Sequence, residues 1–175
     1  MESTRRAGPY LLGPAFAVGG TSTVHLASLR TREGFRRTSV VKRLREELEG
    51  NAAALELLLQ EARIAAHVRQ TNVVPVLDVV RDGDEILLVS EYVHGVTLAT
   101  LMNAGEARIP IPIAVAATIA RDLLDGLHAA HSASSAGVPL GIVHRDVSPE
   151  NVIMGEDGIA RWSTSGSPTP RAGGA

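Results

Sequence analysis

The sequence contains no cysteine, and aromatic residues make up only 3% of its 175 residues. Without cysteine, disulfide bonds and thiolate metal sites are excluded and a reducing compartment is compatible, so we expect a cytoplasmic protein. Long apolar runs are also missing. The longest, residues 109–120, is interrupted by two prolines and stops before Arg121, which is too short to span a bilayer. Residues 1–8 are polar, so the sequence predicts neither a signal peptide nor a membrane segment.

Charge of one sign is not in excess either. Charged residues make up 21% of the chain and the net charge is −2, which gives no reason to expect nucleic acid or an anionic membrane as a partner. Hydrophobic residues make up 45%, so the composition is that of a globular protein. A chain of 175 residues corresponds to one domain of common size, large enough to bury a core.

The first half of the chain alternates apolar runs with turn residues. Two such runs flank Gly19-Gly20 and a later pair flanks an Asp-Gly turn, and both patterns are typical of β-hairpins. A helix is expected at residues 51–69, where leucines and alanines recur at helical spacing. Together these signals predict a five-stranded antiparallel sheet with one helix. The predicted strands are residues 10–18, 23–29, 38–44, 73–80 and 86–92.

The second half is expected to be mainly helical. A short helix is predicted at residues 95–104 and a longer one at 112–132, with a proline suited to its first turn. One face of the longer helix is predicted to be apolar, formed by Val115, Ile119, Leu123, Leu124 and Leu127. A loop of small residues and an apolar pair then lead into a polar loop.

The polar loop spans residues 144–151, which read His-Arg-Asp-Val-Ser-Pro-Glu-Asn. A His-Arg-Asp followed five residues after the Asp by Asn, and then by an apolar pair, resembles the catalytic loop of a protein kinase. Further features follow the order of that family: a glycine turn ending in Val24, a strand lysine, Lys42, and then a helix glutamate, Glu61. The sequence is therefore identified as similar to bacterial, eukaryotic-like serine/threonine protein kinases, over roughly residues 10–158.

This resemblance implies a two-lobed α+β, protein kinase-like fold. It places a five-stranded small lobe, its helix and the hinge at residues 10–93, and a partial, mainly helical large lobe at 94–162. Residues 1–9 and 163–175 fall outside both lobes, and we expect them to be a disordered N-terminus and a disordered tail. A complete protein kinase domain is expected to reach about 250 residues, so the large lobe should be incomplete in this chain.

The resemblance also implies a site for ATP and Mg²⁺. Gly19 and Gly20 would let backbone N–H groups approach the phosphates, although Ala17 and Ser22 stand where the family usually has further glycines. Lys42 would hold the α- and β-phosphates. The side chains expected around adenine are Val24, Val40 and Ile153, and the backbone groups expected to bond to it are those of Glu91 and Val93.

Phosphoryl transfer would depend on the polar loop itself. Asp146 would receive the proton of the substrate hydroxyl, Asn151 would bind Mg²⁺, and Arg145 would contact a phosphorylated activation loop. Glu61 would pair with Lys42 and hold it against the phosphates. The resemblance thus implies an ATP-dependent transferase acting on protein hydroxyls, with a protein substrate that the sequence does not identify.

Each of these residues alone has a plainer interpretation. The glycine turn fits an ordinary hairpin, Lys42 fits a solvated side chain on an edge strand, and Glu61 fits a solvated helix flank. The polar loop by itself fits a connection between two short strands. Only their ordered combination favours the kinase interpretation.

The strongest departure from the family follows Gly158. An Asp-Phe-Gly triplet, whose Asp holds a metal ion, is expected there, but the corresponding residues are Thr164-Ser165-Gly166. A threonine hydroxyl is a poor magnesium ligand compared with a carboxylate, so we expect weak phosphoryl transfer or none.

Three explanations of this ending stay open. Codons for residues 161–168 can be chosen so that a shift of one base yields Leu-Val-Asp-Phe-Gly-Ile-Ala, which favours a frameshifted or truncated gene product. The alternative is a pseudokinase, a nucleotide- or partner-binding regulatory module without catalysis. A third is a product that folds poorly, which an unpacked apolar face on the helix at 112–132 would favour.

Overall fold

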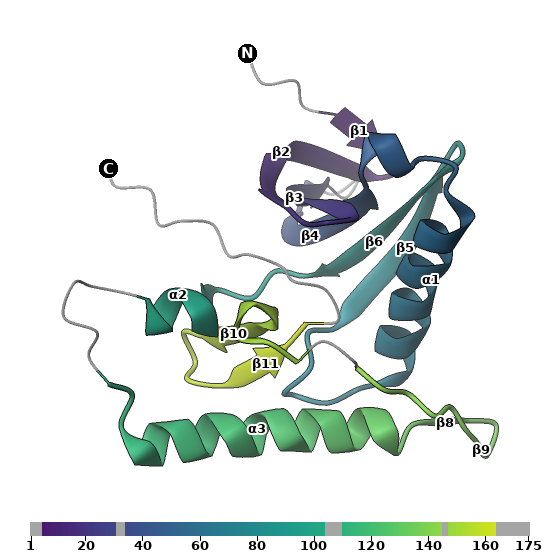
Figure 1. Ribbon diagram of the computed structural model, residues 1–175. Coiled ribbons are helices and arrows are strands. Elements are labelled where there is room, and N and C mark those ends of the chain that lie inside the picture. The colour runs from purple at the N-terminus through teal and green to yellow at the C-terminus, as the bar shows by residue number, and fades with distance from the viewer. Residues whose placement is uncertain (1–4, 31–33, 104–109, 145–146, 164–175) are drawn as a thin grey trace, which may run out of the picture. The chain divides into compact units, whose positions relative to one another are not determined.

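The computed structural model describes residues 5–30, 34–103, 110–144 and 147–163 (Figure 1). The chain divides into two compact units. Unit 1 comprises Met1–Arg63 and Pro75–Tyr92, and unit 2 comprises Ile64–Val74 and Val93–Ala175. Residues 64–74, which were expected in the small lobe, therefore group with unit 2.

Unit 1 is built on a six-stranded antiparallel sheet in the order β1-β2-β3-β4-β6-β5. The strands are β1 (Arg5–Ala7), β2 (Tyr10–Val18), β3 (Ser22–Arg30), β4 (Arg36–Leu44), β5 (Val76–Asp82) and β6 (Glu85–Glu91). Strands β2 to β6 confirm the predicted antiparallel sheet. Gly83, in the turn between β5 and β6, has a φ of +64°, a conformation that glycine adopts without strain.

Strand β1 corrects two expectations, the disordered N-terminus at residues 1–9 and the count of five strands. Ala7 lies opposite Tyr10 of β2 and is only 1% exposed. No sequence pattern predicted this strand, because a short edge strand needs few apolar residues and two arginines precede the single buried alanine.

Two apolar clusters lie on opposite faces of this sheet, because alternate residues of β6 belong to different clusters. One face is covered by α1 (Ala52–His67), which Figure 1 shows alongside β5 and β6. Leu58 and Ala62 of α1 pack in a cluster with Leu88. The helix begins after Asn51, whose side-chain oxygen accepts hydrogen bonds from the N–H groups of the second and third residues that follow, both at 3.1 Å.

Among its described residues, unit 2 contains a three-stranded sheet in the order β11-β10-β7, a two-stranded sheet of β8 and β9, the α-helices α2 and α3, and the short 3-10 helix η2. Its elements are β7 (Gly95–Thr97), α2 (Leu98–Met102), α3 (Ile113–His131), β8 (Ser134–Ser135), β9 (Val138–Pro139), η2 (Pro149–Asn151), β10 (Val152–Gly155) and β11 (Ala160–Trp162). The short helix predicted at 95–104 is thus wrong in its first turn, which is a strand. Thr97 ends this strand and caps α2, since its hydroxyl oxygen accepts the N–H of Thr100 at 3.0 Å.

Trp162 is the centre of the unit 2 core. Its ring is fully buried in a cluster with Val73 and Ala130. Its backbone N–H donates to the carbonyl of Asn72, and its own carbonyl accepts the N–H of Val74, both at 3.0 Å. These bonds tie β11 to the segment 72–74, which explains why that segment groups with unit 2.

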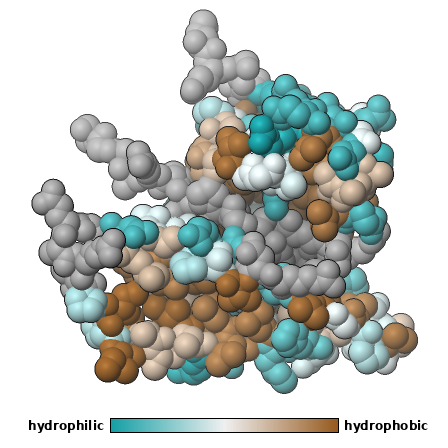
Figure 2. All heavy atoms as spheres, in the orientation of Figure 1, coloured by the Kyte–Doolittle hydropathy of each residue, from teal (hydrophilic) through white to brown (hydrophobic). Residues whose placement is uncertain are grey.

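The apolar face of α3 differs from the predicted one. Ile119 is buried and Leu123 and Leu127 are half-buried, but Val115 and Leu124 are 45% and 65% exposed. Residues 123 and 124 are about 100° apart around the helix axis, and in this helix Leu123 packs in the core while Leu124 points away from it. Figure 2 shows apolar residues gathered over the N-terminal part of α3. Of the helices that the structure describes, none is long and apolar enough to cross a membrane.

A methyl group at Gly126 of α3 has no room. A Cβ built there would overlap the indole nitrogen of Trp162 and lie 3.0 Å from the carbonyl oxygen of Asn72. Gly126→Ala should therefore lower the free energy of unfolding by about 1–3 kcal/mol, the usual cost of overpacking, although alanine is the better helix former. Unfolding in urea, followed by the fluorescence of Trp162, the single tryptophan, measures the change in the free energy of unfolding. The control is Gly20→Ala, whose added Cβ meets no atom within 4 Å. Equal or higher stability of Gly126→Ala would contradict this packing.

Asp157 holds the turn between β10 and β11. Its carboxylate accepts hydrogen bonds from both terminal nitrogens of Arg161, at 3.0 and 2.6 Å, and from the N–H of Ile159 at 3.1 Å. These bonds, those of Arg161 first, lower the pKa of Asp157 from 3.8 to about 2.

Because folding lowers this pKa, Asp157 should stabilise the hairpin above pH 3.8, and the stabilisation should disappear as the pH falls toward 2. Arg161→Gln should raise the pKa of Asp157 back toward its ordinary value, since it removes the main cause of the shift. An NMR titration of the carboxyl carbon of Asp157 measures this pKa in the wild-type chain and in Arg161→Gln. The same midpoint with and without Arg161 would show that the ion pair does not form in solution.

Candidate functional site

The residues of unit 1 that were predicted to meet the nucleotide share one face of the sheet. Val24 on β3 lies directly opposite Lys42 on β4, and Val40 precedes Lys42 by two residues on the same strand. Opposed residues share a face and side chains alternate along a strand, so these three side chains point to the same side. Both valines are buried and Lys42 is half-buried.

The same face continues toward α1. Leu44, two residues after Lys42, packs with Leu88 and with α1 in one cluster. Lys42 therefore lies between a predicted adenine contact, Val40, and the part of the sheet that α1 covers. Glu61 belongs to α1, but its side chain lies outside the described part of the structure. Its pairing with Lys42 stays a prediction.

The glycine turn leaves space for a ligand. The N–H of Gly19 donates to the carbonyl of Ser22 at 2.7 Å, which closes the turn between β2 and β3. Both Gly19 and Gly20 are exposed, and a Cβ built at Gly20 would meet no atom within 4 Å. A phosphate group can therefore approach the backbone at Gly20 without displacing a side chain of unit 1.

The predicted hinge begins at the end of β6. The N–H of Glu91 donates to the carbonyl of Pro75 at 2.9 Å, and its carboxylate lies 4.0 Å from the guanidinium of Arg37. Glu91 is the last residue of β6 and its side chain is exposed, so its backbone position is fixed by the sheet and not by side-chain packing. Val93 is half-buried and is the residue at which the second segment of unit 2 begins.

In unit 2 the short helix η2 positions Asn151. The residue is buried; its N–H donates to the carbonyl of Ser148 at 3.0 Å, and its carbonyl accepts the N–H of Ser163 at 2.9 Å. Ile153 follows on β10, is also buried, and pairs with Thr97 on one side and Arg161 on the other. The predicted metal ligand and the predicted adenine contact are thus held by adjoining elements of one unit.

His144 anchors the start of the predicted catalytic loop. Its Nε2 lies 3.1 Å from the carbonyl oxygen of Ser163, and because a carbonyl only accepts, this nitrogen carries a proton. The imidazole also packs edge-on against the ring of Trp162, with centroids 4.6 Å apart and planes at 89°. Arg145 and Asp146 lie outside the described residues, as does the triplet at 164–166, so their predicted roles are untested.

The described residues fit a nucleotide more fully than a metal ion. An apolar pair and a cation on one sheet face, beside an open glycine turn, supply the contacts that a flat base and its phosphates require. For Mg²⁺, Asn151 offers one amide oxygen, a ligand type that the ion accepts. Within the described ranges, no group of three or more His, Cys, Asp or Glu residues could hold a metal.

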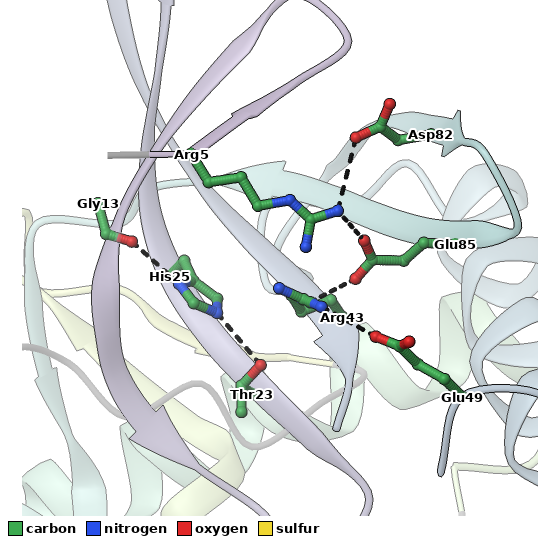
Figure 3. A network of polar contacts seen from close by, with 8 residues as sticks. All are labelled: Arg5, Gly13, Thr23, His25, Arg43, Glu49, Asp82 and Glu85. Carbon is green, nitrogen blue, oxygen red and sulfur yellow. Dashed lines mark hydrogen bonds and ion pairs between the residues drawn. The ribbon is translucent and has the colours of Figure 1, made fainter. Parts of the chain in front are cut away.

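The sequence interpretation missed a polar network on the opposite face of the unit 1 sheet, shown in Figure 3. Its central residue is Arg43, the neighbour of Lys42, which is buried and pairs with Glu85 and Glu49. An arginine on a strand normally indicates a solvated surface. The one sequence feature that could have indicated partners for a buried arginine is the abundance of carboxylates in the linker after β4 and around the start of β6.

Comparisons with known proteins agree with the geometry. Residues 17–162 match the protein kinase domain family. The chain is 35% identical over 149 residues to the tyrosine-protein kinase MasK of Myxococcus xanthus, covering 84% of this chain and 23% of MasK. It is 34% identical over 166 residues to the serine/threonine-protein kinase PknL of Mycobacterium tuberculosis, covering 95% of this chain and 38% of PknL. The chain thus spans well under half the length of these curated relatives.

Among solved structures, a mutant kinase domain of Mycobacterium tuberculosis PknI superposes with a TM-score of 0.72 at 19% sequence identity. The match covers 95% of this chain and 63% of the PknI chain, and it shows that the two share a fold. Further relatives include the serine/threonine-protein kinase PkaB of Streptomyces coelicolor, 37% identical over 118 residues, which are 67% of this chain and 26% of PkaB. The chain therefore belongs to the protein kinase domain family, and its relatives include bacterial serine/threonine kinases.

Proposed function

We propose that this chain binds ATP as a serine/threonine-type protein kinase domain and transfers phosphoryl groups to protein hydroxyls inefficiently with its present sequence. The observation that carries the proposal is the shared face of Val24, Val40 and Lys42. Two buried apolar side chains suit the adenine ring, and a cation beside them suits the phosphates. The serine/threonine type rests on relatives such as PknL and PkaB, while MasK, a tyrosine-protein kinase, marks the competing substrate class.

Each remaining residue has a defined task in this proposal. Lys42 binds the α- and β-phosphates, and Glu61 keeps the lysine in that orientation. Gly19 and Gly20 give the phosphates access to the backbone. Adenine is recognised by apolar contact, to which Ile153 contributes, and by backbone groups. Those groups are the carbonyl of Glu91 and the N–H of Val93.

Phosphoryl transfer depends on the loop that His144 anchors. Asp146 accepts the proton of the substrate hydroxyl, Asn151 is the protein ligand of Mg²⁺, and Arg145 responds to a phosphorylated activation loop. A second carboxylate is expected at position 164, where this chain has threonine. Losing such charge stabilisation costs at least about 3–4 kcal/mol, or a few hundredfold in rate, so transfer should be slow.

A frameshifted gene end, one of the explanations that the sequence leaves open, would account for this loss. The second candidate function is a pseudokinase that holds nucleotide or a partner without catalysis. The exposed apolar residues of α3, Ile113, Val115 and Leu124, fit this function because such a face suits a protein partner, and they fit the poorly folding product equally well.

Lys42→Met tests the nucleotide site. We expect ATP to raise the melting temperature of the wild-type chain, and we expect the variant to bind ATP about tenfold more weakly or worse, since one charge-assisted hydrogen bond is lost. Differential scanning fluorimetry over an ATP series measures both. The matched control is Arg37→Met, which removes an exposed cation from the same strand. A wild-type chain without any ATP-dependent shift would refute the proposed function, and equal shifts in both variants would refute the role of Lys42.

Thr164→Asp tests the missing metal ligand. The added carboxylate should make ATP binding tighter in the presence of Mg²⁺ than in its absence, because two oxygen ligands from the protein bind the ion better than one. Titration of ATP with and without Mg²⁺ measures the difference, and Thr164→Asn serves as the uncharged control. If aspartate and asparagine behave alike, residue 164 does not lie at the metal, and the pseudokinase alternative gains support.

A further inference from the structure

Arg43 and Lys42 are neighbours on β4, so their side chains leave opposite faces of the sheet. The side chain of Arg43 is only 9% exposed although it is charged. Its Nε pairs with Glu85, which is equally buried, and its Nη2 lies 3.1 Å from a carboxylate oxygen of Glu49 (Figure 3). One guanidinium therefore joins two acidic side chains from different parts of unit 1.

Glu85 extends this network to the N-terminal strand. Its second carboxylate oxygen accepts a hydrogen bond from Arg5 of β1 at 2.5 Å, and Arg5 also lies 3.6 Å from Asp82. Buried charges are costly unless they are paired, so each member of this network constrains the others. The network links β1, the adjoining ends of β5 and β6, β4 and the linker that follows β4.

Arg43 marks the end of a backbone ladder. Pairing between β4 and β6 stops at Arg43 and Leu87, and β4 itself ends one residue later. The ion pair with Glu85 continues the connection between these strands beyond their last backbone pair. Without it, the end of β4 that carries Lys42 would be held on the β6 side only by the backbone ladder and by the packing of Leu44 on Leu88.

The same arginine fixes the linker into α1. After β4 the N–H of Arg45 donates to the carbonyl of Thr21 at 3.1 Å, and Glu49 then binds Arg43. Asn51, two residues after Glu49, caps α1. The start of α1 is thus tied through Glu49 to the strand that bears Lys42. The body of α1 covers the opposite face of the sheet, the face that carries Lys42, and packs there through Leu58.

We propose that Arg43 is a positioning residue for nucleotide binding: through Glu85 and Glu49 it fixes the end of β4 and the start of α1, and so holds Lys42 where it binds phosphates. This inference rests on the proposed function. Arg5 of β1 binds the same carboxylate of Glu85 and so helps to hold Glu85 in place for Arg43.

The best probe is Glu49→Gln. The side chain of Glu49 is 52% exposed, and removing its charge leaves Arg43 paired with Glu85, so no buried charge is left alone. The affinity for ATP should fall at least about fivefold, the lower end of typical couplings between sites. The affinity for adenosine should stay unchanged, because adenosine lacks the phosphates that Lys42 binds. Isothermal titration calorimetry with ATP and with adenosine measures how much each affinity changes between the wild-type chain and Glu49→Gln.

Glu47→Gln is the matched control. Glu47 lies in the same linker and pairs with Arg45 at 3.3 Å, outside the network of Arg43. We expect both of its affinities to equal those of the wild-type chain. Arg43→Lys should behave like Glu49→Gln, because one ammonium cannot reach both carboxylates. Equal losses for ATP and adenosine in Glu49→Gln, or no loss for either, would overturn the inference.

A second measurement needs no nucleotide. Hydrogen exchange of residues 45–56 should be faster in Glu49→Gln than in Glu47→Gln, since only the first releases the linker. Equal exchange in the two variants would overturn the positioning role even if the chain binds ATP. If the wild-type chain binds neither ATP nor adenosine, the proposed function fails and the phosphate part of the inference fails with it. The exchange result then still decides whether Arg43 positions α1.

Discussion

The alternation of side chains along β4 is the constraint on which both faces of unit 1 depend. Val40 and Lys42 point to the face that carries the predicted nucleotide contacts, and Arg43 points to the other. A slip of one residue in the register with β3 would bring Arg43 opposite Val24 and turn Lys42 toward the apolar cluster around Val41. The buried pairing of Arg43 with Glu85 opposes this slip, because it is satisfied in one register only.

In unit 2 the backbone of Ser163 has a comparable part. Its N–H donates to Asn151 and its carbonyl accepts from His144, so one residue fixes both ends of the predicted catalytic loop. Backbone bonds of this kind do not depend on the side chain that follows at Thr164. Both ends of the loop can therefore be held in place in a chain that has threonine at position 164, so these bonds do not establish the activity.

Prediction from sequence succeeded where one local signal decided the structure. Periodicity and turn residues were enough for β2 to β6, α1 and α3, and the ordered motifs were enough for the family. Pairing with distant segments was not visible: β7 was taken for helix because Gly95–Thr97 acquires its strand conformation by pairing with β10, far along the chain. Arg43 was missed for the same reason, since its burial depends on Glu85 and Glu49, which no local pattern connects to it. The roles of Asp146 and Arg145 came from resemblance alone and stay predictions.

The distribution of the cores bears on how the two proposed activities depend on each unit. Unit 1 has two apolar clusters, and α1 covers one face of its sheet, so the residues assigned to the phosphates belong to a sheet with a core on each side. Unit 2 has its own core around Trp162, but α3 also exposes Ile113 and Leu124. Stability is not uniform across such a structure, and the unit with the unpacked apolar face should open first. The phosphate contacts proposed for Lys42 of unit 1 and the phosphoryl transfer proposed for the loop of unit 2 can therefore be weakened separately, which is the physical condition for a chain that binds ATP but transfers phosphoryl groups slowly.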